Sequence, residues 1–385
     1  MRSVIALMAL AACVAEPAAP TSGGKDTGAG GDSADSGESG VETGETGDSG
    51  DTGEDTGEDA LAITTFGTAD GVPNATWYGL SVAIDGSVWG ATDQGLIHFD
   101  GTTTRIYTAV DGLLSDKPHS VLAHSDGTIW VGHLGDDVRQ GEHLRVESDG
   151  SLTLIAIIDF TESSEITSIY RMREQPFGVG AGDVWMGTNE GLCVWDADLD
   201  VLAEHAHPVH PHSATLGVGF TREGDTWNAD QYQLSRWQFS NDGDLSPGLV
   251  ANGGDLLEYW VEWPVEFEEI VGSSDLDVDA YTVWVASSLY GVARVEAGVG
   301  TTGTSVTTLL PTPATATSIR VGRLGHVWVG STDGLHLLDG ETGAATPIGA
   351  TWLPSMTIQQ FAAGDRAMWI ATPLGLVRVV GTPTE

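Results

Sequence analysis

Short runs of alternating apolar and polar residues, separated by glycine-containing turns, extend from about residue 61 to the end of the chain. The turn signals in one stretch are Asp85-Gly86 and Asp93-Gln94-Gly95, which favour hairpins because glycine readily adopts positive φ. The runs between them have the composition and period of β-strands: SVAID at 81–85, SVWGAT at 87–92, LIHFD at 96–100 and TRIYT at 104–108. This stretch therefore predicts four consecutive antiparallel strands.

The second and third runs of this unit recur along the chain. VWGATDQGL at 88–96 has close copies at 184–192, 327–335 and 368–376, and looser ones at 129–137, 226–234 and 283–292. Each copy has a tryptophan, at intervals of 41 to 57 residues: Trp89, Trp130, Trp185, Trp227, Trp284, Trp328 and Trp369. A period mostly in the forties predicts four-stranded propeller blades. We expect the tryptophans to be core residues, and the small residue after each to leave room for a bulky side chain of the next blade.

Both ends of the repeated region have incomplete units. TTFGTADGV at 64–72 matches RIYTAVDGL at 105–113, so it has the outer strand and connector of a blade with nothing before it. The final unit ends at GLVRVVG, residues 375–381, without an outer strand. We expect the N-terminal segment to complete the last blade, because ring closure removes free sheet edges. The sequence thus predicts an all-β, seven-bladed β-propeller over residues 61–385, with four-stranded blades closed by an N-terminal outer strand.

The unit SVAIDGSVWGATDQGLIHFDG at 81–101, followed by DGL at 111–113, resembles the two-component-regulator propeller repeat. That family forms the periplasmic sensor region of many bacterial hybrid histidine kinases and also occurs in free-standing exported proteins. The resemblance covers about residues 61–385 and is strongest in the first, sixth and seventh units. It implies a propeller with a sensor-like binding role. The sequence departs from the sensor kinases because it shows no spanning helix, kinase region or DNA-binding region.

Residues 1–12 have the features of a lipoprotein signal peptide. Arg2 precedes a short apolar run, and LAAC at 10–13 resembles a bacterial lipobox, in which cleavage precedes the cysteine and Cys13 carries the lipid. An ordinary secretory signal with an incidental cysteine is the alternative. Val14 follows Cys13, which resembles export to the outer membrane of a Gram-negative host. We therefore expect an exported, lipid-anchored protein at the outer membrane, on its periplasmic side or the cell surface.

Residues 13–60 predict a disordered linker behind the lipidated cysteine. They are rich in Gly, Asp, Thr and Glu, as in GETGDSGDTGEDTGED at 44–59, and cannot bury enough apolar surface to fold. The whole chain has 15 basic and 55 acidic residues, a formal net charge of −40. This charge excludes nucleic acid as an obvious partner and argues against direct docking on an anionic membrane. We expect a monomer that contacts the membrane only through its lipid.

The densest candidate for chemistry is EHAHPVHPH at 204–212, in the expected connector between the third and fourth blades. Neutral imidazoles beside a carboxylate suit a divalent metal ion such as zinc, copper or nickel. The proposed ligands are His205, His207, His210 and His212. A solvated polar loop is the alternative, because no fixed metal-ligand spacing is matched. SSDLDVDAY at 273–281 matches a calcium loop only in part, and an acidic surface loop in an enlarged hairpin is the favoured interpretation.

The inner strands of a propeller begin at one mouth of its central channel. We expect an aromatic residue, an imidazole, two carboxylates and an amide to converge there and bind a polar ligand: Tyr78, His119, Glu165, Glu268 and Gln359. A water-filled channel is the alternative. Cys193, in GLCVWD, is expected to be a buried apolar residue on the third strand of its unit rather than a nucleophile.

The sequence contains no serine nucleophile elbow, phosphate-binding loop, nucleotide fingerprint or HExxH motif, so no catalytic residue is assigned. The leading hypothesis is a binding module for a protein, glycan or small-molecule ligand outside the cytoplasm. One alternative is a metal-dependent enzyme of the lyase type, because some exported seven-bladed propellers that resemble this chain are lyases. Another is a sensor subunit for a separate membrane signalling partner. Fold alone does not decide among them.

Overall fold

The described part of the chain is built of β-strands and belongs to one compact unit, Thr56–Glu385. The computed structural model describes residues 62–135, 140–160, 166–176, 180–196, 201–206, 214–221, 226–230, 234–239, 256–261, 273–279, 282–289, 291–296, 306–310, 313, 315–322 and 326–381. Two short 3-10 helices, η1 (Thr68–Asp70) and η2 (Ala109–Asp111), lie within these ranges. None of the helices described is long and apolar enough to cross a membrane.

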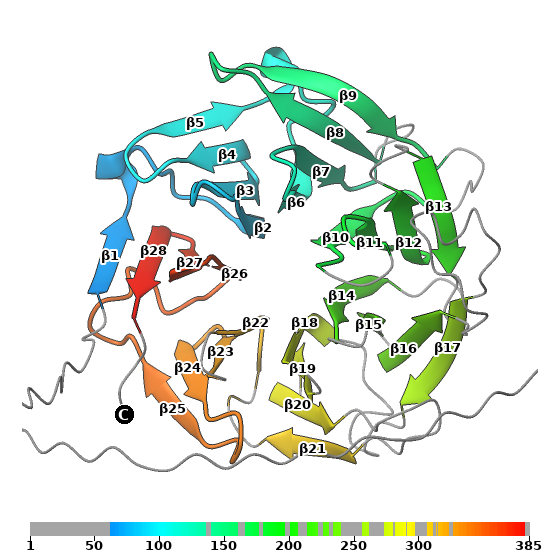
Figure 1. Ribbon diagram of the computed structural model, residues 1–385. Coiled ribbons are helices and arrows are strands. Elements are labelled where there is room, and N and C mark those ends of the chain that lie inside the picture. The colour runs from blue at the N-terminus through cyan, green and yellow to red at the C-terminus, as the bar shows by residue number, and fades with distance from the viewer. Residues whose placement is uncertain are drawn as a thin grey trace, which may run out of the picture. The chain divides into compact units, whose positions relative to one another are not determined.

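Within these residues the strands form seven four-stranded antiparallel sheets arranged as a ring, here called blades 1 to 7 (Figure 1). From the inside outward, blade 1 is β2 (Trp77–Val82), β3 (Val88–Thr92), β4 (Gly95–Phe99) and β5 (Thr104–Tyr107). Blade 2 is β6 (Pro118–Ala123), β7 (Ile129–His133), β8 (Gly141–Val146) and β9 (Leu152–Ile158). Blade 3 is β10 (Ile169–Glu174), β11 (Val184–Thr188), β12 (Gly191–Asp196) and β13 (Val201–Ala206).

The remaining blades follow the same order. Blade 4 is β14 (Thr215–Phe220), β15 (Thr226–Asp230), β16 (Leu234–Phe239) and β17 (Leu256–Val261). Blade 5 is β18 (Ser273–Asp279), β19 (Thr282–Ser287), β20 (Gly291–Glu296) and β21 (Val306–Leu310). Blade 6 is β22 (Ser318–Val321), β23 (Val327–Gly330), β24 (Leu335–Leu338) and β25 (Ala345–Ile348). Blade 7 is β26 (Gln360–Ala363), β27 (Ala367–Thr372), β28 (Gly375–Val380) and β1 (Ala62–Phe66).

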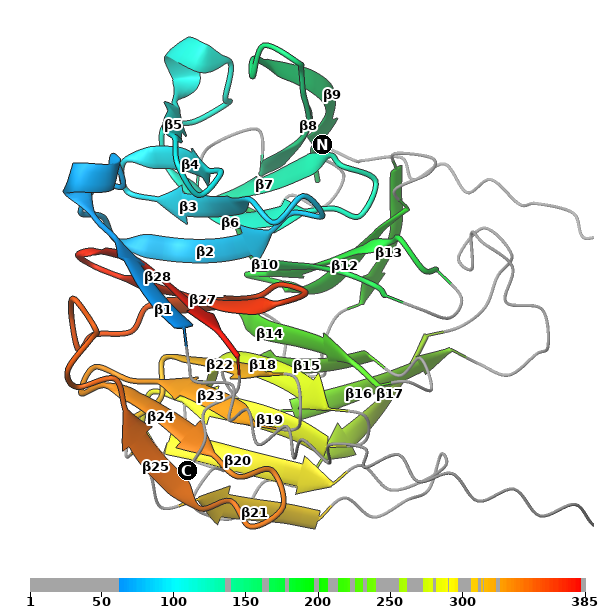
Figure 2. The same ribbon diagram turned by 60° about the vertical axis from the view of Figure 1, so that its left-hand side comes forward.

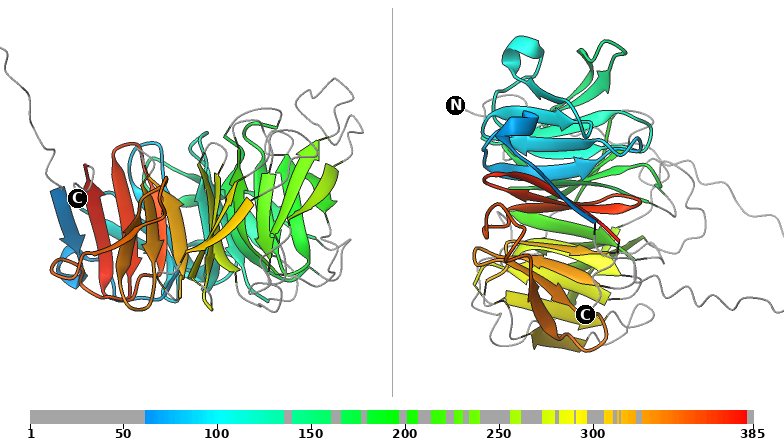
Figure 3. Two further views of the ribbon diagram at one scale, coloured as in Figure 1. Left: turned by 90° about the horizontal axis from the view of Figure 1, so that it is seen from below. Right: turned by 90° about the vertical axis from the view of Figure 1, so that its left-hand side faces the viewer.

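The all-β propeller prediction is confirmed, and the way the ring closes is visible. The inner strands of successive blades contact one another in order, and β26 of blade 7 contacts β2 of blade 1. Strand β1 forms the outer strand of blade 7 by pairing with β28, from Ala62 opposite Val380 to Phe66 opposite Leu376 (Figure 2). Seen from its rim, the ring shows its blades side by side (Figure 3). Residues from near the two ends of the repeated region therefore share one sheet.

The recurring stretch around the tryptophan is a strand, a tight turn and a second strand, held by a buried hydroxyl. In blade 1, Thr92 Oγ1 donates to the Gly95 carbonyl at 2.8 Å and accepts from the Gln94 amide at 3.1 Å. The same hydroxyl-to-carbonyl bond forms in blades 3, 6 and 7, from Thr188, Ser331 and Thr372. In these four blades the hydroxyl of Ser or Thr satisfies a carbonyl inside the turn, whereas blades 2 and 4 have His133 and Asp230 at this position.

One predicted strand is displaced. The sequence favoured a strand over 81–85, whereas β2 covers Trp77–Val82 and residues 83–86 form the turn. The reason is local: the Ala83 and Ser87 backbones bond to each other at 2.9 Å, and Asp85 Oδ1 accepts from the Ser87 amide at 2.9 Å. The apolar residues Ala83 and Ile84 therefore belong to a turn, and the inner strand begins four residues earlier than predicted.

The seven repeat tryptophans are core residues, as predicted, with exposed fractions of 4% or less. The glycines that follow them leave room for a neighbouring side chain, which differs from blade to blade: at Gly90 it is Trp77 of the same blade, and at Gly132 and Gly330 it belongs to the segment that forms or leads to the next inner strand. A Cβ at Gly132 would lie 2.8 Å from Ile169 Cβ of blade 3, and one at Gly330 would lie 2.5 Å from Ile358 beside blade 7. At these two glycines the space is taken by the chain at the start of the next inner strand.

Candidate functional site

A cavity with a volume of about 600 Å³ lies where inner strands end in hairpins. We call it the hairpin-face cavity; it is lined by residues 82–86, 123–125, 174, 363–367, 369 and 378. These residues come from blades 1, 2, 3 and 7. The volume falls within the range of small-molecule sites. Its walls carry charges of both signs over an apolar base that includes Ala123, Ala367 and Trp369.

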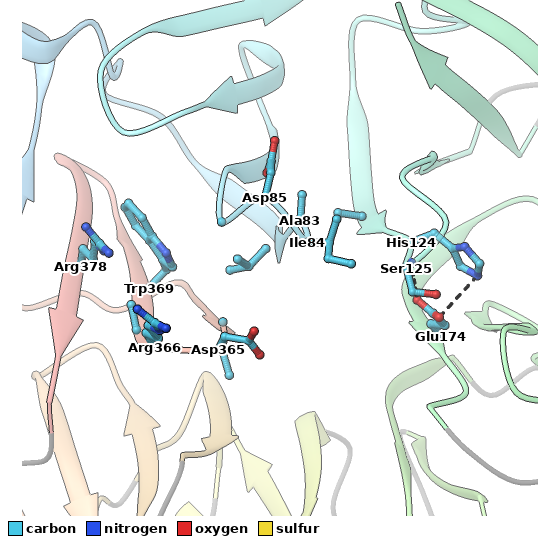
Figure 4. A pocket seen from close by; sticks show the side chains of 16 residues that line it. Ala83, Ile84, Asp85, His124, Ser125, Glu174, Asp365, Arg366, Trp369 and Arg378 are labelled. Carbon is cyan, nitrogen blue, oxygen red and sulfur yellow. Dashed lines mark hydrogen bonds and ion pairs between the residues drawn. The ribbon is translucent and has the colours of Figure 1, made fainter.

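A histidine between carboxylates forms one wall (Figure 4). His124 is 5% exposed, and its Nε2 lies 2.7 Å from the Gly182 carbonyl and 3.7 Å from Glu174 Oε1. Its Nδ1 lies 2.9 Å from Asp126 Oδ1. Burial lowers the pKa of His124, but the Gly182 carbonyl, Asp126 and Glu174 outweigh burial and raise that pKa above its ordinary value. Glu174 Oε2 accepts from the Ser125 amide at 2.8 Å, which fixes the carboxylate at the wall.

Two arginines and a tryptophan form the opposite wall, on the hairpin and strands of blade 7 (Figure 4). The Arg378 guanidinium carbon lies 5.8 Å from the centre of the Trp369 ring, within the range of a cation–π contact. Arg366 and Arg378 are both exposed, so each can turn its donors toward an acceptor in the cavity. This wall therefore favours a carboxylate or another anionic group beside a planar apolar surface.

Acidic side chains border the cavity between these walls. Asp85 lies on the hairpin of blade 1 and Asp365 on that of blade 7, both exposed. Burial raises the pKa of Asp85, but hydrogen bonds from Ser87 outweigh burial and lower it below its ordinary value, so Asp85 is ionised at neutral pH. Ile84, beside it, is 83% exposed, an unusual position for a large aliphatic side chain.

Three of the predicted channel-mouth residues are described, and they lie at the other ends of the inner strands, away from this cavity. Tyr78 and His119 come together, with their rings stacked 4.8 Å apart, and His119 also contacts Tyr170 edge to face at 5.8 Å. Burial, aided by the positive charge of Arg171, lowers the pKa of His119 to about 4, so its imidazole is neutral at physiological pH. Gln359 is tied to the backbone, because its Oε1 accepts from the Trp77 amide at 3.1 Å. Glu165 and Glu268 lie outside the described residues.

The predicted metal ligands lie largely outside the described residues. Only the backbone of His205 is described, and it belongs to outer strand β13, opposite Cys193, rather than to a connector. This placement differs from the prediction because β13 extends to Ala206. His207, His210, His212 and Cys13 are not among the described residues. Within the residues whose side chains are described, no three His, Cys, Asp or Glu are grouped to hold a metal ion. Cys193 lies on the third strand of blade 3 and is fully buried.

The acidic segment at 273–281 corrects another expectation. It was favoured as a surface loop in an enlarged hairpin, whereas Ser273–Asp279 is β18, the inner strand of blade 5. Asp275 is completely buried, and its Oδ2 accepts from Ser318 Oγ at 3.0 Å, the Ile319 amide at 3.2 Å and Arg320 Nη1 at 3.1 Å. Alternating aspartates on an inner strand are explained by arginines at the ring centre, which the sequence pattern does not reveal.

The site residues that sequence reasoning missed lie in the hairpins after the inner strands. Asp85-Gly86 predicts a turn, but nothing in this dipeptide indicates that its neighbours line a cavity. The one available signal was Ile84, an apolar residue next to a turn. The exposure of Ile84 becomes evident only when the position of the turn at residues 83–86 is known.

Comparison with known proteins gives structural neighbours and no sequence relatives. No protein-family model matches the sequence, and no curated protein matches it. Among solved structures, the chain is similar to virginiamycin B lyase from Staphylococcus aureus, with 14% identity, a TM-score of 0.60, and coverage of 83% of this chain and 99% of the lyase. It is similar to the extracellular domain of a protein assigned as a hybrid two-component system in B. thetaiotaomicron, with 14% identity, a TM-score of 0.57, and coverage of 84% and 40%.

A third neighbour is PorZ, a surface component of the type-IX secretion system of Porphyromonas gingivalis. The identity is 17%, the TM-score 0.59, and the coverage 80% of this chain and 47% of PorZ. At such identities the likeness shows the fold alone. All three neighbours support the propeller architecture.

Proposed function

We propose that this chain is an exported propeller of the two-component-regulator repeat type that binds a ligand in the hairpin-face cavity. The observation that carries the proposal is the cavity itself, whose volume of about 600 Å³ and mixed apolar and charged walls suit a small polar ligand. The neighbours from extracellular sensor and surface proteins are consistent with export. We further propose that Cys13 carries a lipid that holds the protein at the outer membrane as a monomer.

The distribution of charge over the walls favours a zwitterionic ligand of peptide character. Arg366 and Arg378 flank Trp369 on one side, and Glu174 faces them from the other, with Asp85 between. A carboxylate placed near the arginines and an ammonium group near the carboxylates would both gain charge-assisted hydrogen bonds. An apolar or aromatic centre would lie beside the apolar lining of Ala123 and Ala367. A ligand with one sign of charge would meet a repulsive wall.

Binding of a dipeptide tests this proposal. Isothermal titration of the full chain with glycyl-tyrosine should show one site. The N-acetylated dipeptide and the dipeptide amide, each lacking one charge, should bind about three- to tenfold more weakly, the range expected for a partly exposed charge contact. Glu174→Gln should weaken binding of the free dipeptide but not of the N-acetylated form. Arg366→Gln should weaken binding of the free dipeptide but not of the amide.

The control for this experiment is Arg145→Gln, because Arg145 lies on β8, is 58% exposed and is not part of the cavity. It should bind like the unaltered protein. Equal affinity for all three dipeptide forms, or no binding of any of them, would overturn the zwitterion proposal. Binding of a glycan or protein that Arg366→Gln and Glu174→Gln leave unchanged would place the binding surface elsewhere on the ring.

A lyase-type enzyme is the second candidate function, and one observation favours it. The chain matches 99% of the length of virginiamycin B lyase but only 40% of the two-component protein. Under this proposal a divalent metal ion would be required, with the histidines of 204–212 as candidate ligands. Metal analysis of the full chain, with and without His205→Ala and His207→Ala, tests it. A sensor subunit acting through a separate membrane partner remains a variant of the binding proposal.

A further inference from the structure

Five charged side chains meet at the centre of the ring. Arg171 and Arg173 come from β10 of blade 3, Arg320 comes from β22 of blade 6, and Asp275 and Asp277 come from β18 of blade 5. Arg320 Nη1 lies 3.1 Å from Asp275 Oδ2, and Arg171 Nη2 lies 3.6 Å from Asp275 Oδ1. Arg173 Nη2 lies 3.8 Å from Asp277 Oδ1. Three positive charges thus face two negative ones, in a chain whose overall charge is strongly negative.

The three arginines differ in how well their donors are satisfied. Arg171 donates to the Leu216 carbonyl at 3.0 Å, to Gln360 Oε1 at 2.8 Å and to the Ser274 carbonyl at 3.2 Å, so all its guanidinium nitrogens have acceptors. Arg320, which is 4% exposed, uses Nη1 on Asp275 and the Ile319 carbonyl. Arg320 Nε and Arg173 Nη2, by contrast, are buried and have no hydrogen-bond partner among the described residues. Buried donors left this way are costly.

These three arginines also line one small cavity. Its volume is about 40 Å³, and its remaining walls are the inner strands of blades 1 and 2, residues 79–81 and 120–122, together with Met172. A cavity of this size holds a water-sized occupant and excludes a phosphate surrounded by its own hydration. Ser81 lies in the wall, and its hydroxyl already accepts from the Ala123 amide at 3.0 Å, so its proton is free to point elsewhere.

We propose that this central cavity binds a single monatomic anion, chloride under ordinary conditions, between Arg173 and Arg320. A halide ion accepts from donors in any direction, so it can satisfy both buried nitrogens at once. It also brings three positive charges and two negative charges into balance, which a water molecule does not. Burial and the nearby charge of Arg320 lower the pKa of Arg173 to about 10, although Asp277 and Asp275 act in the opposite direction.

Thermal unfolding of the full chain tests this proposal. Sodium chloride is varied against sodium gluconate at constant ionic strength, so that general screening does not change. The unfolding temperature should rise saturably with chloride, by about 2 to 4 °C when chloride exceeds its dissociation constant about tenfold. Bromide should substitute for chloride. The ³⁵Cl resonance should broaden in the presence of the protein, and bromide should reverse the broadening.

Arg173→Gln removes one positive charge and leaves two arginines facing two aspartates. This variant should fold and lose the chloride response and the ³⁵Cl broadening. Arg145→Gln, which changes the same residue type on an exposed strand, should keep both. If chloride and gluconate act equally on the unaltered chain, or if Arg173→Gln keeps the chloride effect, the cavity binds no anion and the proposal fails. The ³⁵Cl measurement on the unaltered protein decides the question even where a variant does not fold.

Discussion

At the residue scale, the residue opposite a repeat tryptophan on the next strand determines which side chain packs on the tryptophan ring. Trp89 stacks on His98 at 4.3 Å, and Trp130 stacks on His143 at 4.0 Å, each across a strand pair. In blade 7 the same position is Arg378, which is exposed, and there the pair forms a wall of the hairpin-face cavity. A cross-strand partner is the unit of sheet stabilisation. In blade 7 the partner of the repeat tryptophan therefore lines the cavity as well as packing on the ring.

The glycine that follows a repeat tryptophan is predicted to be intolerant of a side chain. Gly132→Ala would place a Cβ 2.8 Å from Ile169 Cβ and against Ser120 Oγ, so blade 3 must shift. We expect a loss of about 1 to 3 kcal/mol in the free energy of unfolding, measured by urea denaturation. Gly67→Ala is the matched control, because its nearest contact would be an ordinary 3.6 Å to the Leu374 carbonyl. Equal effects of the two substitutions would contradict the packing explanation.

At the element scale, the second, third and fourth strands of a blade were predictable from the sequence, and the inner strand was less so. The segments 87–92, 96–100 and 104–108 match β3, β4 and β5 to within a residue, because Trp, Thr and Gly recur there for packing and turn reasons. The residues of the inner strands depend on contacts with neighbouring blades, so the sequences of these strands differ from one blade to the next. Asp275 and Arg171 pair across the ring from distant parts of the chain, so no local pattern could connect them. The hairpin-face cavity escaped prediction for the same reason.

Ring closure by β1 is predicted to support the whole sheet assembly. Phe66, at the end of β1, lies 5.7 Å from the Trp369 ring and 4.8 Å from the Phe99 ring, so it joins blade 7 to blade 1. Phe66→Ala should therefore lower the free energy of unfolding by about 2 to 4 kcal/mol. Ile106→Ala, on outer strand β5 and 38% exposed, should cost less than about 1 kcal/mol. A smaller effect of Phe66→Ala than of Ile106→Ala in urea denaturation would show that β1 contributes little to closure.

At the scale of the whole molecule, basic side chains are concentrated in two places although the chain as a whole is strongly acidic. The chain carries a net charge of −40, yet three of its 15 basic residues meet at the ring centre and two more lie at the hairpin-face cavity. The centre is therefore electrostatically unlike the rest of the chain, and the proposed anion would experience a local field there that the net charge does not describe. The fold class followed from the repeat because every unit obeys the same packing rule. The sites did not follow from the repeat, because each site is built from residues at positions whose identity differs from one repeat unit to the next.

The proposed lipid anchor belongs to this scale, because it would decide where the protein is located. The full chain expressed with its own N terminus should be cleaved before Cys13, carry the mass of a lipid there and partition with membranes. Cys13→Ser should remain uncleaved or be released as soluble protein. Recovery of the unaltered chain free of lipid, with cleavage at another position, would favour an ordinary secretory signal.

The pairing of β1 with β28 has a mechanical consequence under the proposal that a lipid at Cys13 holds the protein by its N terminus. Load applied to residues before Ala62 reaches the ring through β1, whose first residue pairs with Val380. Because the pull enters at the end of an antiparallel pair, it separates the residue pairs one after another rather than all together. Blade 7 is thus the element that yields first when the tether is stretched. Its strands β26, β27 and β28 carry much of the cavity lining, including Trp369 and Arg378. Tension on the anchor and occupancy of that cavity should therefore influence each other.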